Sequence, residues 1–104
     1  MANIKKASAA GTFYPSDKSE LLNIINNFKC KETEYSSRAV IVPHAGYIYS
    51  GELANCGISH LKPDAKNVFI FAPAHFERIF GCAVCSYDAF ETLLGNIDVN
   101  KELS

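Results

Sequence analysis

Long apolar runs are absent from this sequence of 104 residues. No window approaches the roughly 20 apolar residues that a membrane-spanning helix needs, so we expect no membrane span. The N-terminal residues also lack a continuous apolar core of signal-peptide length, which favours a cytoplasmic protein. Ten basic and eleven acidic side chains give a net charge of −1 and form no block of one sign. Nucleic acid is therefore not an expected partner, because its binding needs clustered Lys and Arg.

Several motifs of known chemistry are missing as well. The sequence contains no P-loop, no Gly-x-Gly-x-x-Gly and no Gly-x-Ser-x-Gly. No motif of these types therefore indicates nucleotide binding or serine-hydrolase chemistry. Cysteine is present four times, at Cys30, Cys56, Cys82 and Cys85, and a cytoplasmic location predicts that all four are thiols. Cys82 and Cys85 have the spacing of half a zinc site or of a redox pair, but no further ligands follow at zinc-site spacing, so we expect them to be buried and inert.

The apolar pattern predicts an α/β domain. Hydrophobic residues recur at helical spacing in two segments and form short runs rich in β-branched residues in others. The expected helices are 17–29 and 51–61, and the expected strands are 39–42, 68–72 and 81–86. Strand, helix and strand over residues 39–72 constitute a βαβ unit with a right-handed crossover. We expect a turn or short helix at 87–95 and irregular structure at 1–15.

Two histidines follow the expected strands directly. His44 comes after Pro43, and His75 stands two residues after Pro73. Because parallel strands end at the same edge of a sheet, a βαβ unit can place both imidazoles side by side, where such sheets bind ligands. Each imidazole could hold a metal or act as a general base, or it could brace its own loop. His60 lies near the end of the helix 51–61 and is expected to be structural.

Aromatic residues in two segments could contribute to the same site. Phe13 and Tyr14 stand between a glycine and a proline, where they could wall a pocket or anchor the N-terminal arm. Tyr47 and Tyr49 follow His44 and could offer a hydroxyl to the same site or pack at its rim. The pattern alone favours anchoring for Phe13 and Tyr14, and leaves Tyr47 and Tyr49 open.

Four strings resemble the N-terminal part of the Memo family, whose microbial members are called AmmeMemoRadiSam system protein B. They are Ala9-Ala-Gly-Thr-Phe-Tyr-Pro15, Val42-Pro-His-Ala-Gly-Tyr-Ile-Tyr-Ser-Gly51, Phe71-Ala-Pro-Ala-His75 and Ser86-Tyr-Asp-Ala-Phe-Glu-Thr92. The resemblance implies a three-layer α/β fold similar to LigB-type class III extradiol dioxygenases. It implies that His44 and His75 bind a divalent or redox metal, iron or copper, and that Phe13 lines the pocket. Because Tyr47 follows His44 closely, we expect it to line the same pocket. Radical SAM and AMMECR-type proteins are the implied functional associates.

The same resemblance predicts that these residues form a single but incomplete domain, 1–104. Family members are well over twice as long, and a third histidine and a cysteine of their pocket lie in the later part. We therefore expect a fragment that carries two of the pocket histidines and cannot catalyse alone, from a dioxygenase-like metalloprotein. The alternative is a non-catalytic module whose pocket binds a small molecule or peptide.

Overall fold

The computed structural model describes residues 2–31 and 34–104, which divide into two compact units. The helical unit is Ala7–Ala65, and the sheet unit joins the N-terminal residues up to Lys6 with Lys66–Ser104. Within the described ranges, no helix is long and apolar enough to cross a membrane. Two helices and a mixed three-stranded sheet are compatible with the expected α/β class.

The first helix of the helical unit, α1, spans Lys18–Asn27 and confirms the expected segment 17–29. Asp17 stands at its N-cap in extended geometry, and one carboxylate oxygen accepts a hydrogen bond from the Glu20 N–H at 3.0 Å. This bond satisfies one of the backbone donors that every helix leaves unpaired in its first turn. Leu21 is buried to 5% exposure, so the predicted apolar face is the one that packs.

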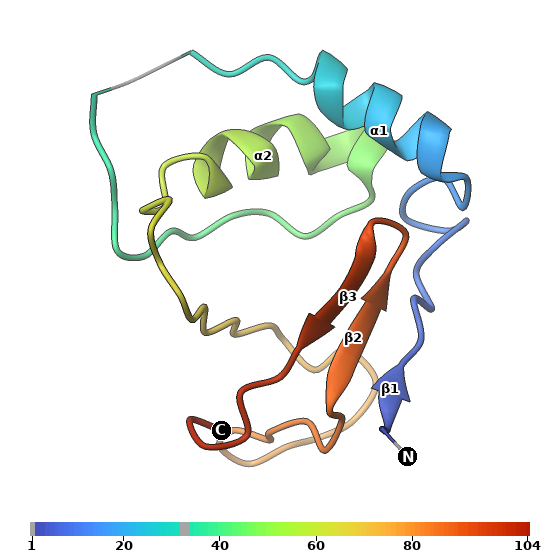
Figure 1. Cartoon of the computed structure of the whole chain (residues 1–104), viewed down its shortest axis with the longest axis vertical. Coiled ribbons are helices and arrows are strands. Elements are labelled where there is room, and N and C mark those ends of the chain that lie inside the picture. The colour runs from blue at the N-terminus through green and yellow to red at the C-terminus, as the bar shows by residue number, and fades with distance from the viewer. Residues whose placement is uncertain (1, 32–33) are drawn as a thin grey trace. The chain divides into compact units, whose positions relative to one another are not determined.

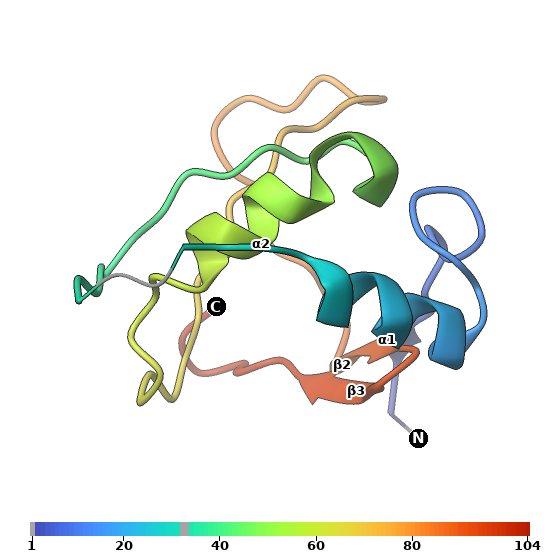
Figure 2. The same cartoon turned by 90° about the horizontal axis from the view of Figure 1, so that it is seen from above.

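The second helix begins with a π-helical turn, η1, over Tyr47–Gly51 and continues as α2 over Glu52–Ile58. The expected helix 51–61 is therefore confirmed, but it starts earlier and ends sooner. Gly51 is buried at the junction, and a Cβ there would lie 2.8 Å from Cζ of Phe28. The missing side chain lets the end of α1 approach the π-helical turn. Figure 2 shows α1 and α2, with residues 34–46 running between them as an extended connection.

Three short strands form the sheet unit (Figure 1): β1 at Ile4–Lys5, β2 at Ala89–Thr92 and β3 at Gly95–Asp98. β2 lies in the middle, parallel to β1 and antiparallel to β3. The expected turn or short helix at 87–95 is wrong, because most of that segment is a β-hairpin. The local signal misled because the hairpin depends on pairing with residues 96–98, and Gly95 supplies the φ of +127° that its tight turn needs.

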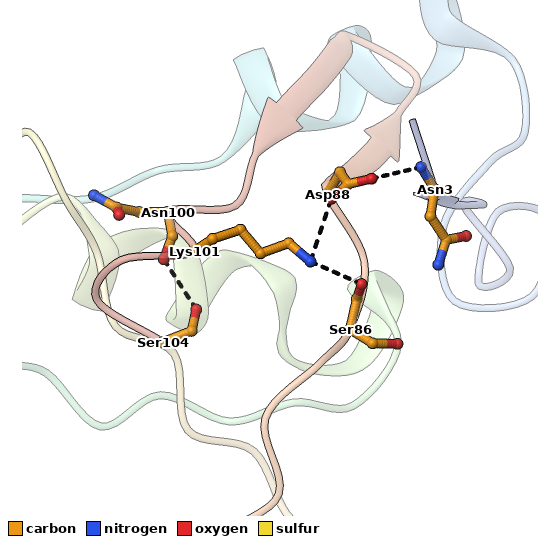
Figure 3. A network of polar contacts seen from close by, with 6 residues as sticks. All are labelled: Asn3, Ser86, Asp88, Asn100, Lys101 and Ser104. Atoms are coloured by element: carbon orange, nitrogen blue, oxygen red, sulfur yellow. Dashed lines mark hydrogen bonds and ion pairs between the residues drawn. The ribbon is translucent and has the colours of Figure 1, made fainter. Parts of the chain in front are cut away.

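A polar network holds the base of this hairpin (Figure 3). One carboxylate oxygen of Asp88 accepts from the Asn3 N–H at 2.7 Å, and the other lies 3.2 Å from Nζ of Lys101. Lys101 Nζ also donates to the Ser86 carbonyl at 2.9 Å. The Asn3 hydrogen bond, followed by the hydrogen bond and positive charge of Lys101, lowers the pKa of Asp88 below its ordinary value.

The strands expected at 39–42, 68–72 and 81–86 are not formed, and the expected βαβ crossover is therefore wrong for this structure. Ile41 is 103% exposed and Phe71 84% exposed, although both were expected inside a sheet. Val42 instead lies by α2, 2.5 Å from where a Cβ on Gly57 would stand. The physical reason is that a strand needs a neighbour for its N–H and C=O groups, and the structure pairs these three described segments with none.

Candidate functional site

His44 lies in the loop that leads into η1. Backbone hydrogen bonds fix the end of this loop: the Tyr47 N–H donates to the Phe13 carbonyl at 2.8 Å, and the Tyr49 N–H donates to the Gly46 carbonyl at 2.9 Å. A Cβ on Gly46 would stand 3.5 Å from the Phe13 carbonyl oxygen, so the loop passes close to the N-terminal arm. The exposed His44 therefore belongs to a segment that is anchored three residues later, at Tyr47.

His75 belongs to the sheet unit, in the irregular segment that precedes β2. It is exposed, and its ring centroid lies 6.3 Å from that of Phe76 in an edge-on arrangement. His44 and His75 thus fall in different units, and their pairing stays a prediction. Among the described residues, His, Cys, Asp and Glu form no group of three or more that could hold a metal ion.

Phe13 and Tyr47, the two predicted pocket residues, line one hollow in the helical unit. Its volume is about 620 Å³, and its walls come from the N-terminal arm, α1 and η1 with the first residue of α2. The Tyr47 ring packs 5.2 Å from that of Tyr14 and 6.3 Å from that of Phe28. Burial, followed by the proximity of Tyr14, raises the pKa of the Tyr47 phenol. Tyr47 therefore presents a neutral aromatic wall.

Sequence reasoning missed part of this pocket, namely Ile24 and Phe28 from α1 and Glu52 from α2. Ile24 and Phe28 are four residues apart, and the helical period puts them on one face, but that period indicates packing and not a pocket. Glu52 carries no such signal. Its Oε1 accepts from the Lys29 N–H at 2.7 Å, a contact that only the folded chain reveals.

His60 has the structural role that its position predicts. Its Nδ1 lies 2.7 Å from the Cys56 carbonyl, and because a carbonyl can only accept, Nδ1 carries the proton. The His60 carbonyl accepts from the Ser37 N–H at 2.6 Å. The residue therefore closes the end of α2 onto the segment that precedes the His44 loop.

The cysteines differ from expectation in two ways. Cys30 and Cys56 form a disulfide between the segment that follows α1 and the middle of α2, so the prediction of four thiols is wrong for this pair. Sequence spacing could not reveal it, because the bond depends on how the two helices pack. Cys82 and Cys85 are thiols as expected, but they are exposed rather than buried, since the strand that was to bury them is not formed.

The comparison with protein families decides the kinship of the chain. Residues 5–104 match the family described as Memo-like protein. This chain belongs to the Memo-like family. It is 36% identical over 104 residues to a MEMO1 family protein of Thermoplasma volcanium and 37% identical over 103 residues to one of Aquifex aeolicus. It is 29% identical over 102 residues to Protein MEMO1 of Xenopus laevis.

These alignments cover nearly all of this chain but a minor part of each Memo-like relative. They include 97% of this chain and 39% of the Thermoplasma protein, 96% and 38% for Aquifex, and 95% and 34% for Xenopus. The chain thus spans less than two fifths of the length of the curated relatives it matches. Family membership is shown for the sequence present, and the activity of a whole Memo-like protein is a separate question.

Proposed function

We propose that this chain is the N-terminal portion of a cytoplasmic Memo-like metalloprotein in which His44 and His75 donate two imidazole ligands to one metal ion. The anchored His44 loop carries this proposal, because the Tyr47–Phe13 hydrogen bond restrains the chain three residues beyond this exposed histidine. Family membership across both histidines supports it. Imidazole suits iron and copper, so the donor chemistry fits either metal.

Two imidazoles make an incomplete site. A mononuclear non-haem iron centre uses two histidines and a carboxylate, or a comparable third donor. We propose that further ligands come from a segment like the one that the longer relatives have beyond the aligned part, within a three-layer LigB-like fold. On this proposal, these 104 residues are inactive alone. The metal would supply Lewis-acid or redox chemistry of a dioxygenase-like kind. By family likeness, radical SAM and AMMECR-type proteins are the proposed associates.

Metal content tests the proposal. A longer Memo-like protein that contains these residues, and so can complete the site, is loaded with iron or copper under anaerobic conditions, desalted and assayed for bound metal. His44→Ala and His75→Ala are each expected to lower the bound metal strongly. His60→Ala is the matched control, since its ring already bonds to Cys56 within α2, and metal content should be kept. Metal retained in either of the first two variants would contradict a shared site.

A second candidate function is a non-catalytic module that binds a small molecule or peptide. The aromatic hollow favours this function, because both predicted pocket residues, Phe13 and Tyr47, line a space large enough for a ligand. His44 is not among the residues that line this space. Metal-free protein that still binds a ligand would support this function over the first. Thiol trapping in intact cells tests the proposed cytoplasmic location. A reducing cytoplasm opposes the Cys30–Cys56 bond, so both cysteines should be trapped there as thiols.

A further inference from the structure

The hollow of the helical unit has an unusual lining. Five aromatic side chains from three parts of the unit contribute to it: Phe13, Tyr14, Phe28, Tyr47 and Tyr49. Its volume of about 620 Å³ lies within the range of small-ligand pockets, roughly 300–1,000 Å³. The plane of the Tyr47 ring is tilted by 42° to that of Tyr14 and by 46° to that of Phe28. The hollow is therefore lined by aromatic rings from three parts of the unit, at more than one orientation.

The charge of the lining points to one kind of ligand. Glu52 is its charged side chain, and no Lys, Arg or His is among the described residues that line it. An anion would find no positive partner there, and it would meet the negative faces of the rings. A cation meets favourable charge from both sources, because ring quadrupoles attract a positive group placed over their faces.

Glu52 is held in place for this role. Its Oε1 accepts the Lys29 N–H at 2.7 Å, which fixes the carboxylate between the end of α1 and the start of α2. The disulfide from Cys30 to Cys56 ties the residues after α1 to α2 a second time, one residue beyond Lys29 and one turn beyond Glu52. The carboxylate is therefore positioned before any ligand arrives, and little ordering cost remains for binding.

We propose that this aromatic hollow binds an organic cation, an ammonium or trimethylammonium group, between the rings around Tyr47 and the Glu52 carboxylate. This rests on the second candidate function and adds the class of ligand. The group could belong to a free small amine or to a lysine side chain of a peptide, since both present the same head. The histidines assigned to metal binding take no part in it.

Choline and 3,3-dimethylbutan-1-ol form the deciding pair of probes. The two molecules have the same shape, but choline has a positively charged nitrogen where the alcohol has a neutral carbon. Binding to the full chain is followed by NMR titration of the aromatic resonances. Choline is expected to bind about tenfold more tightly or better, in line with a partly desolvated cation–π contact. Equal affinities would overturn the cation proposal while leaving a ligand-binding pocket, and no binding of either would defeat both.

Substitutions at the lining residues test which side chains bind the cation. Glu52→Gln keeps an acceptor for the Lys29 N–H but removes the charge, and it should weaken choline binding several-fold without affecting the neutral alcohol. Glu102→Gln removes the same charge from the sheet unit and should change neither. Tyr49→Leu serves as a second variant that folding tolerates, since this ring is 84% exposed, and it should also weaken choline selectively. Choline affinity unchanged in both pocket variants would overturn the assignment.

A peptide bearing trimethyl-lysine separates the two sources of the cation. Affinity well above that of choline would identify a protein side chain as the ligand. Affinity equal to that of choline would identify a free small cation. Sodium phosphate and a phosphotyrosine peptide complete the series, and competition by either with choline would contradict the assignment of a cationic ligand.

Discussion

Breaking the Cys30–Cys56 disulfide should strongly weaken the helical unit. The two cysteines are 26 residues apart in the sequence. The loop-closure relation converts a loop of that size into about 3.5 kcal/mol at room temperature, because the crosslink removes conformations from the unfolded chain. The bond also joins the elements that carry Phe28 and Glu52, so its loss should loosen the pocket.

Urea unfolding followed by far-ultraviolet circular dichroism measures this effect, since α1 and α2 supply the helical signal. With a urea dependence of about 1–3 kcal/mol per molar, a dithiol reductant that removes about 3.5 kcal/mol should lower the midpoint by roughly 1.2–3.5 M. Cys30→Ser should show the low midpoint with or without reductant. The exposed pair gives the control: replacing Cys82 and Cys85 by Ser should leave the response to reductant intact.

Thiol alkylation under native conditions checks the premise independently. The oxidised protein should react at Cys82 and Cys85 only, and reduction should add Cys30 and Cys56. Alkylation of all four cysteines before reduction would show that the bond is absent. Identical urea midpoints for the oxidised and reduced protein would refute the reasoning even if the bond is present.

Three further predictions concern packing, charge and association. Gly51→Ala should destabilise the helical unit by about 1–3 kcal/mol in urea unfolding, because its Cβ would meet the Phe28 ring, whereas Ser50→Ala next to it adds no volume and should be near neutral. Because the pKa of Asp88 is lowered in the folded state, this carboxylate stabilises the hairpin above about pH 4, and its contribution is lost as pH falls through the folded pKa. In NMR spectra, the folded population of the hairpin should therefore depend less on acid pH in Asp88→Asn than in the unchanged protein. Phe71→Lys should reduce self-association in light scattering, since this exposed ring belongs to an apolar surface that invites contact between copies.

The part of the fold that the sequence predicts well is local. α1 follows from a cap at Asp17 and an apolar face that includes Leu21, signals contained within a dozen residues. The second helix follows from the same periodicity. The pocket residue Phe13 comes from the resemblance to the family and Tyr47 from its place after His44, and the hydrogen bond between their backbones gives both assignments a physical basis.

The wrong predictions concern contacts between distant segments. The apolar runs 39–42 and 68–72 satisfy the side-chain pattern of a buried strand, but pattern says nothing of whether a neighbouring strand exists. The β2–β3 hairpin, the Cys30–Cys56 bond and the position of Glu52 likewise arise from packing between elements. Each depends on which surfaces meet, which the sequence pattern does not encode.

The metal proposal and the missing strand pairing are physically coupled. Two adjacent strands are what would bring His44 beside His75, and the structure forms neither. The relatives are two and a half to three times longer than the aligned stretch, as the covered shares of 39%, 38% and 34% imply. Chain of that length could pair and cover the exposed apolar runs, and each run would then end beside its histidine. Because a site assembled on folding adds its binding energy to stability, metal should favour that pairing, and the affinity of these 104 residues alone should be far below that of a longer Memo-like protein.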